Sequence, residues 1–196
     1  LAYHYYVPPQ SSASKQVDRN LDAAKRLNVG AMLTETDDRG PFPEIANAAD
    51  AGLQSWASWE WKTCYQDGEE DSVSQMGAWG SRKTGHGPQW YGDAPPPDVQ
   101  ADAARTYATA VAGDIVRMHF NAANGDFELE YDTNSLADAK TPTEIYIWPE
   151  RYPGGAQITA KAKAGALHVD YDGEGSSISI YPDGLEAGTR VSISIR

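Results

Sequence analysis

The first 61 residues alternate between short apolar runs and segments in which apolar residues recur at helical spacing. Runs rich in apolar and aromatic residues at 1–7, 28–35 and 53–61 are typical of strands, and the segments between them are typical of helices. Five alternating elements in so short a length predict a parallel sheet with crossover helices. The pattern is compatible with a closed barrel and with an open sheet.

Both predicted helices have recognisable ends. Ser12 or Ser14 can cap the first helix, which we expect to run to about Leu27. The second helix begins at Pro43, and Gly52 follows its end. The apolar face of the first helix consists of Val17, Leu21, Ala24 and Leu27.

The pattern of apolar residues changes after Gly113, which follows a long loop and a further predicted helix. A long Gly-, Trp- and Pro-containing segment at 62–97 comes first, and a loop of this length is usually functional or mobile. We expect a helix from Asp98 to Gly113. From Ile115 onward, short segments alternate with period two between Gly-containing turns, as in an antiparallel sandwich. The sequence predicts an α/β domain at 1–113 and an all-β domain at 114–196.

Charge and composition exclude several classes of protein. The net charge is −12, and no stripe of Lys and Arg is present, so we expect no nucleic-acid partner. No apolar run approaches the ~20 residues of a membrane-spanning helix. The single Cys64 cannot close an intrachain disulfide. The chain opens on the strand-like "LAYHYYV" without Met, so we expect it to be part of a longer or processed protein.

The carboxyl ends of the three predicted strands carry the candidate site. Functional groups of a parallel sheet or barrel gather at these ends. The residues there are His4, Tyr6, Glu35, Trp59 and Trp61. Since side chains alternate across a strand, the first two share a face, and so do the two tryptophans. We expect a carboxylate, an imidazole, a phenol and an indole wall to line one cavity.

Several short stretches, taken in order along the chain, carry a family resemblance. They are "HYY" at 4–6, "LTE" at 33–35, "SWASWEWK" at 55–62, "RTYATAVAG" at 105–113 and "FELEY" with "PTEIYIWPERYPGG" between 127 and 155. In this order and spacing they resemble glycoside hydrolase family 5, and more narrowly its endoglycoceramidase and glucosylceramidase-like members. The resemblance implies strands six to eight of a (β/α)8 TIM barrel followed by an antiparallel β-sandwich.

The resemblance also implies a retaining mechanism and roles for the site residues. Glu35 matches the nucleophile, and Tyr6 would donate a hydrogen bond that keeps this carboxylate ionised. His4 would hold a sugar hydroxyl or the second carboxylic acid. Trp59 would stack on a pyranose ring, and Trp61 and Lys62 follow it as further substrate contacts. We thus expect Trp59, Trp61 and Lys62 to bind the substrate.

The family's acid/base is the Glu of an Asn-Glu-Pro segment, and no such triplet occurs in these 196 residues. We therefore expect a partner: an N-terminal fragment of the same protein that supplies this residue and the first five strands. Neither a cofactor nor a metal is expected. Thr36 and Asp37 depart from the family pattern, and Asp37 and Asp38 would disfavour ionisation of Glu35 if they pointed inward.

The leading interpretation is a retaining β-glycosidase that hydrolyses glycosphingolipids at a micelle or membrane surface. Two alternatives stay open: a β-glucanase, and a non-catalytic structural or carbohydrate-binding descendant of a family 5 glycosidase. By resemblance, the protein would be secreted or lie in an endomembrane, lysosome-like compartment.

Other aromatic and histidine residues carry weaker signals. Trp79, Trp90 and Tyr91 either form a lipid-facing rim or pack locally in the long segment. Trp59 and Trp61 could likewise fill a core beneath it. The remaining histidines lack metal-ligand spacing, and we assign no role to His86, His119 and His168.

Overall fold

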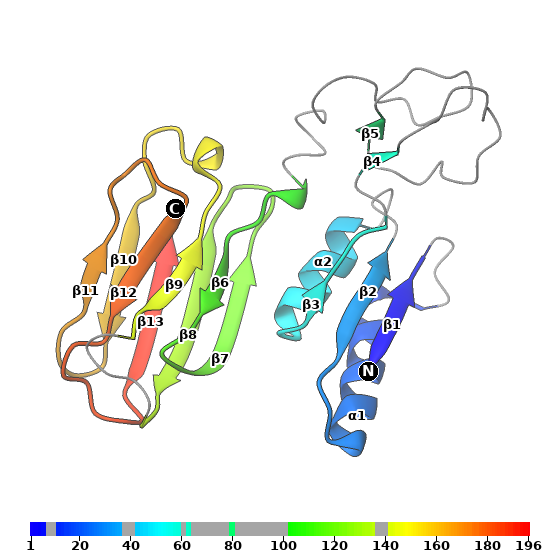
Figure 1. Ribbon diagram of the computed structural model, residues 1–196, viewed down its shortest axis with the longest axis horizontal. Coiled ribbons are helices and arrows are strands. Elements are labelled where there is room, and N and C mark those ends of the chain that lie inside the picture. Colours follow the sequence, from blue (N-terminus) through cyan, green and yellow to red (C-terminus); the bar gives the residue numbers. More distant parts are fainter. Residues whose placement is uncertain (7–10, 37–41, 60–61, 64–78, 81–101, 136–140) are drawn as a thin grey trace. The chain divides into compact units, whose positions relative to one another are not determined.

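The protein is described by a computed structural model covering residues 1–6, 11–36, 42–59, 62–63, 79–80, 102–135 and 141–196 (Figure 1). The chain divides into two compact units, Leu1–Ala103 and Ala104–Arg196. Residues 104–113 therefore lie with the second unit, whereas the sequence pattern placed the domain boundary near Gly113.

The first unit is built on a parallel sheet with crossover helices, as the sequence predicts. Its strands follow the order β1-β2-β3, and both pairings are parallel. A second parallel pair joins β4 to β5. The elements are β1 (Ala2–Tyr5), α1 (Ala13–Leu27), β2 (Met32–Thr36), α2 (Phe42–Ala51), β3 (Ser55–Trp56), β4 (Lys62–Thr63) and β5 (Trp79–Gly80).

The third strand is shorter than expected. The sequence predicts a strand over 53–61, but β3 spans only Ser55–Trp56. Leu53 has a φ of 52°, which belongs to the left-handed region and is incompatible with a strand, so pairing begins after it. Residues 57 and 59 remain hydrogen-bonded to β2 through their backbone N–H groups.

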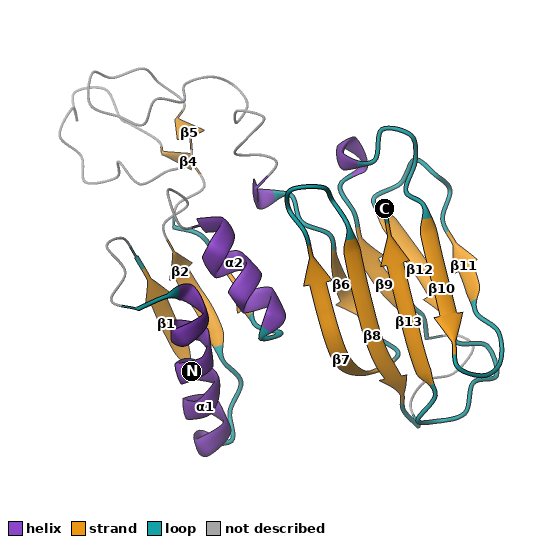
Figure 2. Cartoon of the chain, turned by 180° about the vertical axis from the view of Figure 1, so that it is seen from behind, coloured by secondary structure: helices purple, strands orange, loops and turns teal. Residues whose placement is uncertain are grey.

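Helices α1 and α2 cover the same face of the sheet (Figures 1 and 2). Residues of the two strands β1 and β2 and of the helices α1 and α2 form one buried cluster. It consists of Tyr3, Tyr5, Ala13, Val17, Leu33, Phe42, Ile45 and Ala46. Leu27 does not join the apolar face of α1 as expected, because its side chain is 63% exposed. It is the last residue of the helix, where Asn28 takes the left-handed C-cap conformation and turns the chain away.

The second unit consists of two four-stranded antiparallel sheets. The first sheet has the order β10-β13-β8-β7, and the second has the order β11-β12-β9-β6. Figure 2 shows the first of these sheets lying in front of the second. The elements are β6 (Tyr107–Ala110), β7 (Gly113–Phe120), β8 (Phe127–Thr133), β9 (Thr143–Tyr146), η1 (Pro149–Arg151), β10 (Ile158–Ala162), β11 (His168–Asp170), β12 (Ser177–Tyr181) and β13 (Arg190–Ile195).

Period-two alternation in this unit is confirmed by burial. Every second residue of β8 and of β13 is buried, and so are Ile178 and Ile180 of β12. These inward side chains from both sheets form one hydrophobic cluster. The sequence therefore specifies which face of each strand is buried, since a shift of one residue would exchange the faces.

The helix expected from Asp98 to Gly113 is wrong over residues 104–113. Residues 104–106 are not helical, and β6 and the start of β7 follow them. The alanines between 101 and 112 favour a helix. However, Tyr107 and Thr109 alternate with Ala108, and β-branched and aromatic residues fit a half-buried pleated surface. Pairing with β9 outweighs the helix propensity here.

None of the helices in the described part of the chain has the length and apolar character that crossing a membrane requires.

Gly113 lies where β7 approaches β8 closely, and a substitution there tests this packing. A Cβ added at this position would lie 2.2 Å from the backbone carbonyl oxygen of Asp132, and a backbone atom cannot move aside cheaply. We expect Gly113→Ala to lower the free energy of unfolding by about 2 kcal/mol or more. Chemical denaturation followed by circular dichroism measures this. Gly154→Ala is the matched control, since a Cβ there meets nothing within 4 Å. Equal stability of both variants would contradict the packing.

A second prediction concerns the pair between Asp132 and Arg190. The guanidinium donates to both carboxylate oxygens, over 2.5 and 3.1 Å, and these hydrogen bonds hold the pKa of Asp132 below its usual range. The pair's contribution to stability is therefore present above about pH 4 and is lost as the pH falls through the lower folded pKa.

We expect Asp132→Asn to be less stable than the wild type at neutral pH, and the difference to shrink below about pH 4. Unfolding curves at several pH values measure it. Asp183→Asn removes an exposed carboxylate that has no ion pair within the described ranges, so it should show no such convergence. A difference that stays constant with pH would contradict the assignment.

Candidate active site

The candidate site lies where β1 and β2 run side by side, and it depends on a shift in their register. Tyr3 faces Leu33, but the next residue of β1, His4, faces Glu35. Strand β2 thus contains one more residue than β1 at this point, and the extra residue is Thr34. Such an irregularity re-aims the side chain that follows it. It turns Glu35 away from the buried face that Leu33 occupies.

Two side chains of the first unit meet the same oxygen of Glu35. The Tyr6 hydroxyl donates a hydrogen bond of 2.6 Å to Oε2, and His4 Nδ1 lies 3.3 Å from the same atom. The two rings stand edge to face, with centroids 6.1 Å apart. The Glu35 side chain is 35% exposed and that of His4 is 51% exposed. The carboxylate is thus held on one side and open to solvent.

The expected division of β1 into two faces is confirmed. Tyr3 and Tyr5 are buried on the helix side of the sheet, whereas His4 is exposed and Tyr6 half-buried. The alternative that His4 and Tyr6 form a buried aromatic strand satisfied by backbone groups is wrong, because their polar atoms meet Glu35. The aromatic residues of "YHYY" therefore have two uses: alternate rings anchor the strand and the others contact the carboxylate.

Trp59 is tied to the residue that follows Glu35. Its backbone N–H donates a hydrogen bond of 2.8 Å to the carbonyl of Thr36. Two residues earlier, the N–H of Ala57 donates a hydrogen bond of 2.9 Å to the carbonyl of Leu33. Its indole is 50% exposed, which leaves aromatic surface accessible to a ligand. The alternative for this tryptophan, core filling beneath the segment at 62–97, depends on residues outside the described ranges.

Several expected residues lie outside the described part of the structure. Trp61, Asp37 and Asp38 belong to undescribed ranges, and for Lys62 only the backbone, within β4, is described. The same holds for the rim candidates Trp90 and Tyr91, for the side chain of Trp79 and for His86.

Three contacts behind the site were missed by sequence reasoning. The Thr34 hydroxyl donates 3.3 Å to the carbonyl of Tyr3 at the register shift. Trp56 Nε1 donates 3.2 Å to Asp50 Oδ1, and the buried Tyr3 hydroxyl donates to Gln54 Oε1. Burial raises the pKa of Tyr3 to about 12. These partners follow no periodic spacing, so only the tertiary fold reveals them.

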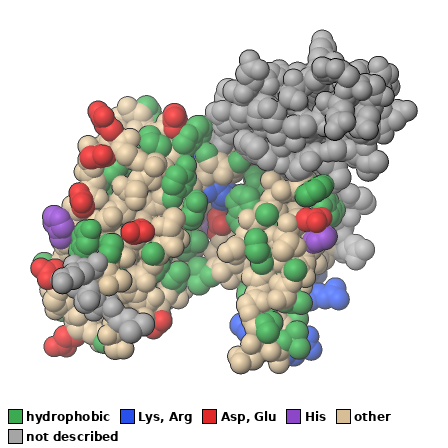
Figure 3. Space-filling view, viewed as in Figure 1, with side chains coloured by type: hydrophobic (Ala, Val, Ile, Leu, Met, Phe, Trp, Pro, Cys, Tyr) green, Lys and Arg blue, Asp and Glu red, His purple; other side chains and the backbone are tan. Residues whose placement is uncertain are grey.

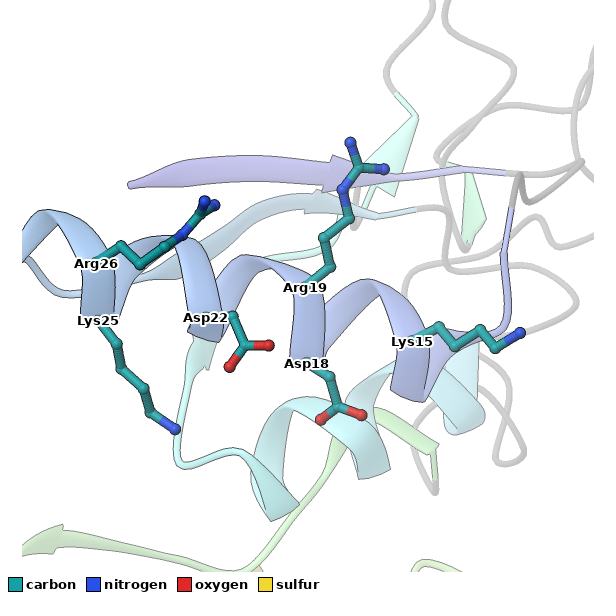
Figure 4. A pocket seen from close by; sticks show the side chains of 6 residues that line it. All are labelled: Lys15, Asp18, Arg19, Asp22, Lys25 and Arg26. Atoms are coloured by element: carbon teal, nitrogen blue, oxygen red, sulfur yellow. The ribbon is translucent and has the colours of Figure 1, made fainter.

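Other polar surfaces of this unit do not form a comparable site. Figure 4 shows a depression along α1 in which Arg19 and Arg26 point to one side and Asp18, Asp22 and Lys25 to the other. Charges at this spacing are typical of an outward helix face. Among the described residues, no group of three or more His, Cys, Asp or Glu side chains could hold a metal ion. The depression is lined by Lys15, Asp18, Arg19, Asp22, Lys25 and Arg26.

Thr34 provides a test of the register shift. We expect Thr34→Val to lower the free energy of unfolding by about 1 kcal/mol, because the shape is kept while the hydrogen bond to the Tyr3 carbonyl is lost. Thr34→Ser keeps the hydroxyl and should lose less. Urea denaturation of both variants measures the difference. An equal loss in both would mean that the threonine methyl, and not the hydroxyl, supports the strand.

Comparison with known proteins relates the chain to glycosidases. Residues 105–195 match the model of the glycoside hydrolase family 5 C-terminal domain. An endoglycoceramidase from Cyanea nozakii is 27% identical over 206 residues, which cover 100% of this chain and 38% of the relative. An endoglycoceramidase from Hydra vulgaris is 30% identical over 163 residues, which cover 79% of this chain and 28% of the relative. The chain thus spans well under half the length of these curated relatives.

Solved structures show the same fold. Endo-glycoceramidase II from Rhodococcus sp., in a five-membered iminocyclitol complex, matches with a TM-score of 0.63 at 15% identity, over 99% of this chain and 42% of that one. The lactosyl-enzyme intermediate of the same enzyme matches with a TM-score of 0.57 at 16% identity, over 99% of this chain and 41% of that one. Sterylglucosidase 1 from Cryptococcus neoformans matches with a TM-score of 0.58 at 14% identity, over 94% of this chain and 31% of that one. This chain therefore belongs to glycoside hydrolase family 5 through its C-terminal domain, residues 105–195, and its curated homologues are endoglycoceramidases.

Proposed function

We propose that this chain is the C-terminal portion of a retaining β-glycosidase that hydrolyses glycosphingolipids, with Glu35 as the nucleophile. The observation that carries the proposal is that Tyr6 and His4 both contact Oε2 of Glu35. Its other oxygen, Oε1, has no hydrogen-bond or ion-pair partner among the described residues. A carboxylate that is oriented through one oxygen and open at the other suits attack on a carbon atom.

In the proposed reaction, Oε1 attacks the anomeric carbon and the bond to the leaving oxygen breaks. A second carboxylic acid, about 5–5.5 Å from the first, gives its proton to that oxygen. Water then attacks the glycosyl-enzyme, loses a proton to the same second carboxylate, and releases Glu35. The Tyr6 hydroxyl holds the nucleophile's geometry through both steps, and this preorganised donor needs no rearrangement when the charge on Glu35 changes.

The acid/base belongs to polypeptide outside this sequence, in the proposed Asn-Glu-Pro segment. The sheet of the first unit supports this. A parallel sheet is normally covered on both faces, yet Met32 is 40% exposed on the face opposite the helices, where His4 is also exposed. We infer that β1, β2 and β3 are strands six to eight of a (β/α)8 barrel, whose first five strands cover this face. The second unit is then the β-sandwich domain of the same enzyme.

The proposed substrate is a glycolipid presented at a micelle or membrane surface. The homologues named endoglycoceramidase support this class, and the solved relative captured as a lactosyl-enzyme intermediate supports a glycosyl-enzyme route. Trp59 offers an indole that is half exposed and tied by its backbone to the residue after Glu35, so a pyranose ring could stack there. Secretion or an endomembrane compartment fits such a substrate.

The test is hydrolysis of fluorescent glucosylceramide and lactosylceramide by the longer protein that includes the N-terminal part. We expect Glu35→Gln to lower kcat on the order of a thousandfold or more, because the attacking oxygen is lost while the shape is kept. Glu44→Gln, on the exposed side of α2, is the matched control and should leave kcat unchanged. Equal hydrolysis by the wild type and Glu35→Gln would rule out this nucleophile.

The same experiment separates the alternatives. Hydrolysis of a soluble β-glucan in preference to both lipids would assign the β-glucanase activity. Binding of the lipids without hydrolysis, by a longer protein that lacks the Asn-Glu-Pro segment, would assign a non-catalytic role.

A further inference from the structure

The outward face of the sheet β11-β12-β9-β6 carries side chains that the proposed reaction does not use. Its two central strands, β9 and β12, alternate, with Ile145, Ile178 and Ile180 buried inward. The outward positions fall between them. They are Tyr107 and Thr109 of β6, Glu144 and Tyr146 of β9, Ser177, Ser179 and Tyr181 of β12, and His168 and Asp170 of β11.

Two aromatic pairs stand on this face. Tyr107 faces Tyr146 across β6 and β9, with ring centroids 5.3 Å apart, and Tyr107 is 43% exposed. His168 faces Tyr181 across β11 and β12, with centroids 5.9 Å apart. Figure 3 shows this face of the second unit, with hydrophobic side chains toward both of its edges and a histidine at the β11 edge.

The strip between the pairs is polar. Glu144 pairs with Ser179, and Ser179 pairs with Asp170, so two carboxylates and a hydroxyl form one row across three strands. None of the outward positions of these four strands is Lys or Arg. Cross-strand aromatic pairs stabilise a sheet by themselves. They do not require an acidic and hydroxyl-bearing strip between them.

The spacing of the pairs indicates the size of the ligand. Tyr146 faces Ser177, and Tyr181 lies four residues further along the same strand. At about 3.4 Å per residue the two aromatic pairs are about 14 Å apart along the strands. A monosaccharide cannot reach both pairs, whereas a short oligosaccharide can.

We propose that this face is a second glycan-binding site that takes an uncharged oligosaccharide, with Tyr146 and Tyr181 as stacking platforms and Glu144, Ser179 and Asp170 as acceptors for sugar hydroxyls. Aromatic faces pack against the apolar faces of pyranose rings, and ionised carboxylates only accept hydrogen bonds. The carboxylates repel sulfated, phosphorylated or sialylated chains, so charge complementarity selects a neutral glycan. The proposal is independent of the catalytic role of Glu35.

The test is calorimetric titration of the longer protein that includes the N-terminal part, carrying Glu35→Gln to prevent hydrolysis, with cellohexaose as the neutral probe. We expect the wild type to bind, and Tyr146→Ala and Tyr181→Ala each to weaken binding by about tenfold, the loss of one stacking platform. Tyr146→Phe and Tyr181→Phe keep the ring and should retain most of the affinity. They also serve where an alanine variant fails to fold, which circular dichroism reports.

Matched controls place the site on this sheet. His168→Ala should weaken binding, whereas His119→Ala, on β7 of the other sheet and also exposed, should not. The proposal is overturned if cellohexaose does not bind, if heparin binds in its place, or if His119→Ala loses binding while the tyrosine variants keep it.

Discussion

The main-chain pairing of β1 with β2 is the constraint on which the candidate site depends. If the two strands kept one register throughout, His4 would face Thr34, and Glu35 would share the buried face with Leu33. The extra residue in β2 instead brings the carboxylate to the side of the imidazole and the phenol. Backbone hydrogen bonds, which every strand needs, thus fix the position of a group whose chemistry is unrelated to them. Side chains on such rigid elements are held more accurately than side chains on loops.

The opposite face of the same strands supplies the rigidity. Tyr3, Tyr5 and Leu33 alternate with the site residues and are buried against α1 and α2, so any displacement of His4 or Glu35 would pull a large side chain out of a packed core. The Tyr5 hydroxyl on this face is also paired, because it donates to the carbonyl of Ser11. Packing on one side and chemistry on the other are therefore two consequences of the period of a strand.

Period and composition predict much of this structure, and the departures have local causes. The strand and helix order of the first unit and the inward residues of β8, β12 and β13 follow from alternation and helical spacing. The site set His4, Tyr6 and Glu35 follows from strand ends. The register shift at Thr34 does not, because no periodic pattern marks the extra residue, whose hydroxyl donates to the carbonyl of Tyr3. The strand at 107–110 does not either, since an alanine-rich segment reads as a helix until its partner β9 is known.

The two candidate sites differ in what they need to be complete. Among the described residues, the carboxylate of Glu35 has a partner for one oxygen only, and the sheet that bears it leaves apolar residues such as Met32 exposed. The proposed chemistry at this site therefore requires further polypeptide. The outward face of β11-β12-β9-β6 draws its aromatic pairs and its acceptors from one sheet, whose buried side is already packed. Since a β-sheet fixes the spacing of its side chains through its own hydrogen bonds, that face is formed without a partner. The proposed glycan binding on this face therefore does not require catalysis by the first unit.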